Sequence, residues 1–256
     1  MRGRELRFRP GARRLSRLYF ALFGNPNLGE HIRSAYFRHI IRGLDLDGQR
    51  ILDAGCGWGP YSYYLARRFP HADVEGCDLL PATAERNAII ARRLGLTNLR
   101  FFTASLDALD VADRYGFILC IDVLEHIPND AQTVVNLGGA LRPGGLLYLH
   151  APRDQFRPIL SQRFAREAAE FEEHVRHGYR QDALVQLARD AGLEVLKAGP
   201  TWRWWAELLW ELNGLGSAFR PLRALTAPLL RPFISLDLRL KGEGRGVYLL
   251  ARKPDA

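Results

Sequence analysis

Three glycines at alternate positions follow a short apolar run and an acid, and this part of the sequence is the best suited to hold a ligand. The run at residues 50–53 continues as Ala54-Gly55-Cys56-Gly57-Trp58-Gly59, and Pro60 suits the first turn of a helix. Glycine permits a tight turn and lets the backbone approach a ligand closely. A dinucleotide fingerprint is GxGxxG, with a pyrophosphate at the helix N-terminus. Here the spacing is GxGxG after Asp53, and a carboxylate at that position suits an ammonium group rather than a phosphate.

A second acid, Asp78, ends the next apolar run, at residues 73–78. A carboxylate at this place in a βαβ unit can accept hydrogen bonds from both hydroxyls of a ribose. Taken alone, Asp53 is also explained as a helix cap or turn residue, and Asp78 as a turn acid at the end of a strand. The two acids together, about 25 residues apart in one βαβ unit, predict a nucleoside ligand that carries an amino group.

Four histidines are candidates for a base that acts on an acceptor hydroxyl: His126, His150, His174 and His177. His150 ends an apolar run at the rim where open α/β sheets bind their substrates. His174 and His177 precede a predicted helix. We take His150 and His174 as the catalytic candidates. A structural histidine, or an ion-paired loop, explains the same residues without catalysis.

Short apolar runs alternate with helical patterns along most of the chain. Strands are predicted over 50–53, 73–78, 100–103, 117–121, 146–150, 194–198 and 247–252, and helices over 31–43, 61–68, 82–94, 130–141 and 181–191. Pro143-Gly144-Gly145 is predicted to end a helix and start a strand. Apolar runs separated by helices favour an α/β fold with a mostly parallel sheet covered on both faces.

Three regions are predicted. Residues 1–44 form a basic lead-in with a helix, residues 45–199 and 245–256 form the ligand-binding core, and residues 200–244 form an apolar helical insertion. In a helix over 202–213, Arg203, Glu207 and Glu211 make one polar stripe, with Arg203 able to pair with Glu207. The apolar face, which includes Trp202 and Trp205, and the apolar residues to 234, interleaved with arginines, suit a substrate cap, a membrane contact through 202–234 or a homodimer interface.

Composition sets further bounds. The net charge of +8 comes largely from arginine and indicates either an arginine-rich proteome or attraction to anionic lipid or nucleic acid. Cys56, Cys77 and Cys120 lie in apolar runs without CxxC spacing, which predicts buried free thiols and no metal site. The apolar runs are too short for a signal-peptide core or a spanning helix. We therefore expect a cytoplasmic protein, with peripheral contact at the inner face of the membrane as an option.

Three ordered motifs resemble those of class I S-adenosylmethionine-dependent methyltransferases, of the small-molecule type 11-like group. They are Ile51–Gly59, the segment Asp122-Val123-Leu124-Glu125-His126-Ile127 and the segment Leu141-Arg142-Pro143-Gly144-Gly145-Leu146-Leu147. The segment His174-Val175-Arg176-His177-Gly178-Tyr179 resembles an element that forms part of the lid over the acceptor in many such enzymes. The resemblance covers about residues 45–200 and the last strand. It implies a Rossmann-like, doubly wound, mostly parallel seven-stranded sheet with an antiparallel last strand and a helical insertion before it.

The resemblance also implies S-adenosyl-L-methionine as cofactor. Asp53 would hold the methionine amino group, Asp78 would bind the ribose and Leu79 would pack on the adenine. The full set of implied contacts is Asp53, Gly55, Cys56, Gly57, Gly59, Asp78, Leu79, Ser105, Leu106, Ile121 and Asp122. Many relatives have Asp in place of Ser105, so here either Ser105 or Asp107 is expected to bond the adenine amino group.

A sulfonium methyl is already activated, so the protein must place a nucleophile in line with it and exclude water. We predict methyl transfer to a small or lipophilic acceptor, with O-methylation as the first expectation and C-methylation as the second. No Asn-Pro-Pro-Tyr or Asp-Pro-Pro-Tyr follows the fourth strand, so nucleic acid is not the expected partner. The alternatives are an RNA methyltransferase, a nicotinamide-dependent oxidoreductase and a catalytically silent binding module.

Overall fold

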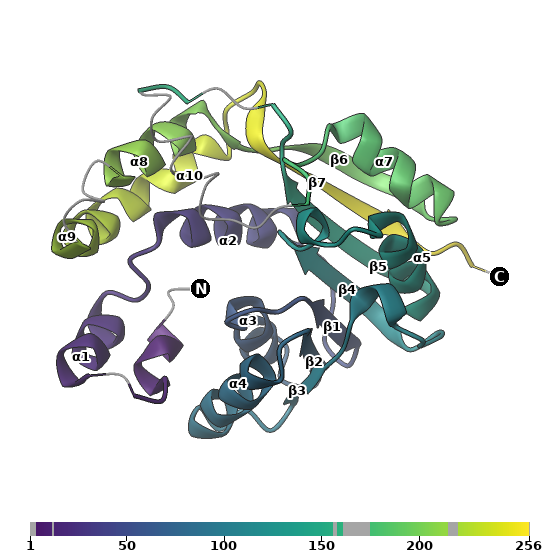
Figure 1. Ribbon diagram of the computed structural model, residues 1–256, viewed down its shortest axis with the longest axis horizontal. Helices are drawn as coiled ribbons and strands as arrows, with labels where there is room; N and C mark the ends of the chain where they lie inside the picture. The colour runs from purple at the N-terminus through teal and green to yellow at the C-terminus, as the bar shows by residue number, and fades with distance from the viewer. Residues whose placement is uncertain (1–3, 12, 156–157, 161–174, 215–219, 256) are drawn as a thin grey trace. The chain divides into compact units, whose positions relative to one another are not determined.

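The computed structural model of the chain describes residues 4–11, 13–155, 158–160, 175–214 and 220–255 (Figure 1). The chain divides into two compact units. Residues 45–154, 175–199 and 247–256 make up the first, which we call the sheet unit. Residues 1–44, 155–174 and 200–246 make up the second, which we call the helical unit. The predicted lead-in and the predicted insertion, far apart in sequence, thus fall in one unit.

Within the described residues, seven strands form one sheet in the order β3-β2-β1-β4-β5-β7-β6. The strands are β1 (Arg50–Ala54), β2 (Asp73–Asp78), β3 (Leu99–Thr103), β4 (Tyr115–Ile121), β5 (Leu141–Pro152), β6 (Glu194–Arg203) and β7 (Gly244–Arg252). β1 runs parallel to both β2 and β4, with Ile51 opposite Val74 and Phe117. β7 is the antiparallel strand. The strand order reverses between β1 and β4, and such a switch point opens a ligand crevice at the carboxyl ends of the strands.

Helices cover both faces of this sheet (Figure 1). They are α3 (Pro60–Arg68), α4 (Pro81–Arg93), α5 (Asp130–Ala140) and α7 (Gln181–Asp190), with short 3-10 turns η2 (Leu106–Ala108) and η3 (Leu124–His126). Neighbouring strand residues point to opposite faces. Phe101 accordingly faces α4, while Phe102 packs on the core cluster that includes Val134 and Leu137 of α5. The predicted Rossmann-like, doubly wound fold is confirmed.

The boundary predicted at Pro143-Gly144-Gly145 is wrong. α5 ends at Ala140 and β5 begins at Leu141, so Pro143-Gly144-Gly145 lies inside the strand rather than before it. The pairing of β4 with β5 shifts register between Tyr115 and Phe117. A Cβ added at Gly145 would lie 2.9 Å from the Tyr115 carbonyl oxygen. The glycine therefore permits a close backbone approach at an irregular strand pairing rather than a helix stop.

The helical unit contains η1 (Arg4–Phe8), α1 (Arg14–Leu22), α2 (Leu28–Ile40), α8 (Trp204–Gly214), α9 (Arg220–Leu230), η4 (Arg231–Phe233) and α10 (Ile234–Asp237). The buried carboxylate of Asp237 connects several elements of the helical unit through hydrogen bonds. It accepts hydrogen bonds from the Tyr36 hydroxyl at 2.5 Å, the Arg203 amide at 2.9 Å and the Ala206 amide at 2.9 Å. One acid thus joins α2, the end of β6 and the start of α8. None of the described helices is both long and apolar enough to cross a bilayer.

The predicted polar stripe of the insertion is wrong in two respects. β6 extends through Arg203 and includes Trp202, which has φ of 55°, so the helix starts only at Trp204 and Arg203 is not part of it. Glu207 pairs with Arg245 at 3.0 Å, not with Arg203, whose guanidinium donates to the Tyr36 hydroxyl. Glu207 is also buried rather than facing solvent, and burial raises the pKa of this carboxyl to about 8. The apolar Trp204 is exposed instead.

Candidate functional site

The glycine loop between β1 and α3 turns through three left-handed residues. Gly55, Gly57 and Gly59 have φ of 73°, 52° and 73°. A Cβ added at Gly55 would lie 2.5 Å from the Val123 side chain, and one at Gly59 would lie 3.2 Å from the Tyr63 ring. At Gly57 no described atom lies within 4 Å of such a Cβ. Gly55 and Gly59 are needed for packing, whereas Gly57 borders open space.

Helix α4 and the end of β2 hold Gly57 in place. The Gly57 carbonyl accepts hydrogen bonds from the Arg86 guanidinium at 2.9 Å and the Asn87 amide at 2.8 Å. The Gly57 N–H donates to Asp78 Oδ2 at 3.0 Å. The Arg86 guanidinium also lies 3.7 Å from the centre of the Trp58 ring. Neither Arg86 nor Asn87 was predicted from the sequence. The available signal was a polar residue, Asn87, on the apolar face of the predicted helix 82–94.

Asp78 lies at the carboxyl end of β2, as predicted for the ribose-binding acid. Its Oδ2 accepts the Gly57 N–H, and its Oδ1 accepts the Leu80 N–H at 3.0 Å. A carboxylate offers about four acceptor positions, so about two remain for a ligand diol. The two backbone bonds fix the carboxylate beside the open space at Gly57.

The Asp53 carboxylate is buried and bonds within the protein, so it does more than face a ligand. Its Oδ2 accepts hydrogen bonds from the Ser62 N–H at 3.0 Å and the Ser62 hydroxyl at 2.5 Å. The side chain is 2% exposed, and burial raises the pKa of its carboxyl to about 7. Asp53 therefore braces the first turn of α3. Among the described residues none donates to Oδ1, so an ammonium contact, which stays a prediction, would use that oxygen.

Asp122 and His150 meet at the carboxyl ends of β4 and β5. His150 Nδ1 lies 2.5 Å from Asp122 Oδ1, and the Asp122 N–H donates to the His150 carbonyl at 2.9 Å. Asp122 has φ of 52°, which is strained for a residue other than glycine and is common at functional sites. The side chain of Asp122 is 22% exposed, whereas that of His150 is 4% exposed. Asp122 is thus the member of the pair that solvent reaches.

The other predicted contacts lie around the same edge of the sheet. Leu79 is exposed after β2, Ile121 is half-buried at the end of β4, and Leu106 is buried in the core. The Ser105 hydroxyl donates to the Asp107 carboxylate. The two residues that are alternative partners for the adenine amino group are therefore bonded to each other. The three cysteines, Cys56 included, are buried free thiols, as predicted. Among the described residues no three His, Cys, Asp or Glu side chains gather as a metal site.

The segment with the lid-like motif is bound to the segment after β4. Arg176 donates to the carbonyls of Leu124 at 2.6 Å, Ile127 at 2.7 Å and Pro128 at 2.9 Å. The Tyr179 hydroxyl donates to Asp130 at 2.6 Å. The segment after β4 and the lid-like segment are thus held together by these bonds, next to Asp122 at the end of β4. His174, the other catalytic candidate, lies outside the described residues.

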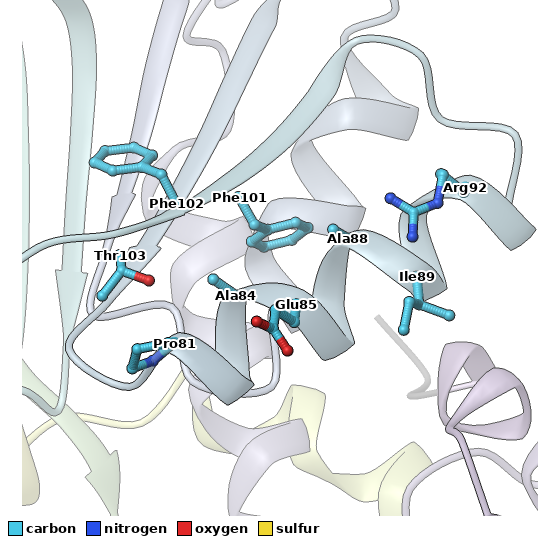
Figure 2. A pocket seen from close by; sticks show the side chains of 9 residues that line it. All are labelled: Pro81, Ala84, Glu85, Ala88, Ile89, Arg92, Phe101, Phe102 and Thr103. Carbon is cyan, nitrogen blue, oxygen red and sulfur yellow. The ribbon is translucent and has the colours of Figure 1, made fainter.

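A pocket of about 480 Å³ lies elsewhere, between α4 and the edge strand β3 (Figure 2). Its lining residues are Pro81, Ala84, Glu85, Ala88, Ile89, Arg92, Phe101, Phe102 and Thr103. Figure 2 shows the Phe101 ring directed toward α4, with Phe102 on the opposite side of the strand. Neither the glycine loop nor Asp78, Asp122 or His150 lines this pocket. It is therefore not the predicted cofactor site.

The architecture and the braced glycine loop are those of the class I methyltransferase fold. A family model described as a methyltransferase domain matches residues 28–198. This chain therefore belongs to the methyltransferase-domain family, and the predicted relationship to S-adenosylmethionine-dependent class I enzymes is confirmed.

Curated relatives include ubiquinone biosynthesis O-methyltransferases. The enzyme of Bordetella avium is 30% identical over 159 residues, which is 58% of this chain and 64% of the relative. That of Leptothrix cholodnii is 27% identical over 157 residues, 59% of this chain and 66% of the relative. The chain thus spans somewhat less than two thirds of the length of these relatives.

Solved structures show the same fold. Phosphoethanolamine N-methyltransferase 2 of Haemonchus contortus, in complex with S-adenosyl-L-methionine, has a TM-score of 0.66 and 16% identity, covering 93% of this chain and 56% of that one. Geranyl diphosphate methyltransferase, in complex with GPP and sinefungin, has a TM-score of 0.62 and 20% identity, covering 86% and 78%.

Proposed function

We propose that the chain binds S-adenosylmethionine at the glycine loop and transfers its methyl group to a hydroxyl of a small or lipophilic acceptor. The observation that carries this proposal is the open space at Gly57, bordered by a left-handed backbone and by the fixed carboxylate of Asp78. The backbone there approaches a ligand closely, and the carboxylate has acceptor positions left for a ribose diol. Both features fit the methionine and ribose parts of this cofactor.

The choice of acceptor rests on the relatives. The curated relatives above are named as O-methyltransferases of ubiquinone biosynthesis, and one structural neighbour is named for geranyl diphosphate. These names favour oxygen as the acceptor atom and a lipophilic molecule as the acceptor. C-methylation is the second candidate. Family membership argues against the nicotinamide-dependent alternative.

When bound, the cofactor supplies a methyl group on a positively charged sulfur. The residues of the chain bind and orient the reactants: the glycine loop and Asp78 hold one end of the site, and the segment that Arg176 braces lies beside the other. Rigid placement of the nucleophile in line with the methyl carbon is the main contribution that such a site can make. Strong acid and base groups are therefore secondary.

A hydroxyl acceptor loses its proton during the transfer, and the Asp122–His150 pair is the proton acceptor that we propose. Asp122 is the more exposed member, so it faces the acceptor, and the buried His150 positions it through the 2.5 Å contact. His150→Asn keeps a polar group near the Nδ1 position, whereas His150→Ala removes it. If His150 positions Asp122, the Asn variant retains activity and the pH profile, and the Ala variant loses activity. Loss of activity in both variants, with a changed pH profile, would assign the proton to His150 itself.

The acceptor is tested with methyl-labelled cofactor. The purified chain is incubated with separate lipid, polar and RNA fractions of a bacterial extract, and the products are analysed by mass spectrometry. We expect label on oxygen in the lipid or polar small-molecule fraction. Label in RNA would establish the RNA methyltransferase alternative. Binding of the cofactor without transfer to any fraction would indicate the silent binding module.

A further inference from the structure

Helix α1 of the helical unit presents an apolar face to solvent. Leu15, Leu18 and Leu22 are 82%, 57% and 56% exposed. Their spacing of three and four residues puts them on one side of the helix. No residue of α1 is buried. This face therefore has no cover from the described part of the chain.

A second exposed apolar face runs along α9, η4 and α10. Leu225, Leu229, Phe233 and Leu236 are spaced by four, four and three residues and are between 47% and 70% exposed. Ala227, on the other side of α9, is buried. Ile234 of α10 is buried as well, so the segment has one side that packs inward and another that exposes four large apolar side chains.

Two hydrogen bonds join α1 to the segment of α9 and η4. The Tyr19 hydroxyl of α1 donates to the Ala224 carbonyl of α9 at 2.7 Å, and the Arg231 guanidinium donates to the Phe23 carbonyl at 2.9 Å. The C-terminal end of α1 and the segment of α9 and η4 are therefore in contact. We call the set Leu15, Leu18, Leu22, Leu225, Leu229, Phe233 and Leu236 the docking face.

The charge around the docking face has one sign. No acid occurs between Glu5 and Glu30, nor between Glu211 and Asp237. Arg13, Arg14 and Arg17 are exposed, and no acid in the described part of the chain pairs with them. Apolar side chains flanked by arginines on a helix too short to span are typical of segments that lie in a membrane interface.

We propose that the helical unit docks on an anionic lipid bilayer through the docking face. Its leucines and Phe233 enter the boundary between headgroups and acyl chains, and Arg13, Arg14 and Arg17 contact lipid phosphates. A two-fold dimer through the same face brings the arginines of one copy toward those of the other, which opposes self-association. Binding of single-stranded nucleic acid relies on aromatic stacking and does not require exposed leucines.

The test is sedimentation of the full chain with phosphatidylcholine vesicles, with and without phosphatidylglycerol. We expect binding to the anionic vesicles that weakens at high salt. Replacing Arg13, Arg14 and Arg17 with Gln is expected to weaken this binding about a hundredfold, from roughly fivefold for each arginine near the surface. Leu225→Glu with Leu229→Glu is expected to abolish it. The matched control is Val135→Glu with Leu196→Glu, two exposed apolar residues of the sheet unit, which should leave binding unchanged.

Thermal unfolding of each variant by circular dichroism shows whether the chain still folds. Absence of wild-type binding to anionic vesicles overturns the proposal, as does equal loss of binding in the control. Light scattering gives the remaining outcome. The wild-type chain could form a dimer that does not bind vesicles and that dissociates in the Leu225→Glu, Leu229→Glu variant. This result would assign the docking face to a subunit interface and would also overturn the proposal.

Discussion

The open space at Gly57 leads to a prediction with a close structural control. Gly57 and Gly95 both have left-handed backbone, with φ of 52° and 67°, and at both an added Cβ meets no described atom within 4 Å. Gly57→Ala and Gly95→Ala should therefore destabilise the fold to a similar extent, by about 1 kcal/mol each, from the left-handed conformation alone. Only Gly57 lies in the proposed cofactor site.

The difference should be seen in ligand binding. If bound S-adenosylhomocysteine fills the space beside Gly57, an added methyl group there costs about 1–3 kcal/mol of binding free energy. Gly57→Ala should therefore weaken S-adenosylhomocysteine by roughly 5- to 150-fold. Gly95→Ala should bind as the wild type does. The free energy of unfolding comes from urea titration, and the affinity comes from isothermal titration calorimetry. Equal affinity in the two variants would refute the assignment of this space to the cofactor. A much larger loss of stability in Gly57→Ala would show that the space is filled by protein.

Three further predictions concern charged side chains. Asp78→Ala should weaken S-adenosylhomocysteine by about 150-fold or more in calorimetry, because the two hydroxyls of the ribose each lose a hydrogen bond to a charged group that contributes roughly 1.5–3 kcal/mol. Asp73→Ala, at the other end of β2, should have no effect on this affinity. Burial raises the pKa of Asp53 to about 7, so this carboxyl is protonated below that pH and loses its attraction for the ligand ammonium. The affinity should therefore fall about tenfold between pH 8 and pH 6, a dependence that Asp53→Asn should remove, and a flat wild-type profile would argue against the ammonium contact. Arg176→Ala should lower the free energy of unfolding by roughly 2–3 kcal/mol, because three backbone carbonyls lose a charged donor. The exposed pair of Arg180 with Asp182 provides the control, and Arg180→Ala should unfold as the wild type does.

The pH dependence of stability has the opposite sign to that of the affinity. A carboxyl whose pKa is raised on folding, as in Asp53, stabilises the folded state fully below its unfolded pKa of about 4. This contribution is lost as the pH rises through about 7. Glu207, with a pKa raised to about 8 by burial, acts in the same direction over a window that extends about one unit higher.

The sequence predicted the sheet well because its strands are short apolar runs between helices. The predicted strand 73–78 is β2 residue for residue, and the predicted helix 61–68 differs from α3 by one residue. The glycine loop was equally readable, since three glycines at alternate positions after an acid have few structural explanations. Local pattern was sufficient for these elements because local geometry determines them.

Tertiary contacts account for the features that local pattern did not show. Asp53 carries no signal that Ser62, nine residues later, takes one of its oxygens. Glu207 looks like a surface residue until Arg245, 38 residues away, is brought to it. The apolar residues up to 234 suit a substrate cap, a membrane contact or a homodimer interface equally well in the sequence. The sequence does not show which side of an amphipathic helix the rest of the fold leaves uncovered.

Hydrogen–deuterium exchange of the wild-type chain with and without S-adenosylhomocysteine tests the assignment most directly, because it reports both whether the ligand binds and where. We predict slower exchange at residues 55–59 and 78–80, with little change along β3 and the part of α4 that lines the pocket in Figure 2. Protection centred on that pocket, or none anywhere at saturating ligand, would contradict a cofactor site at the glycine loop.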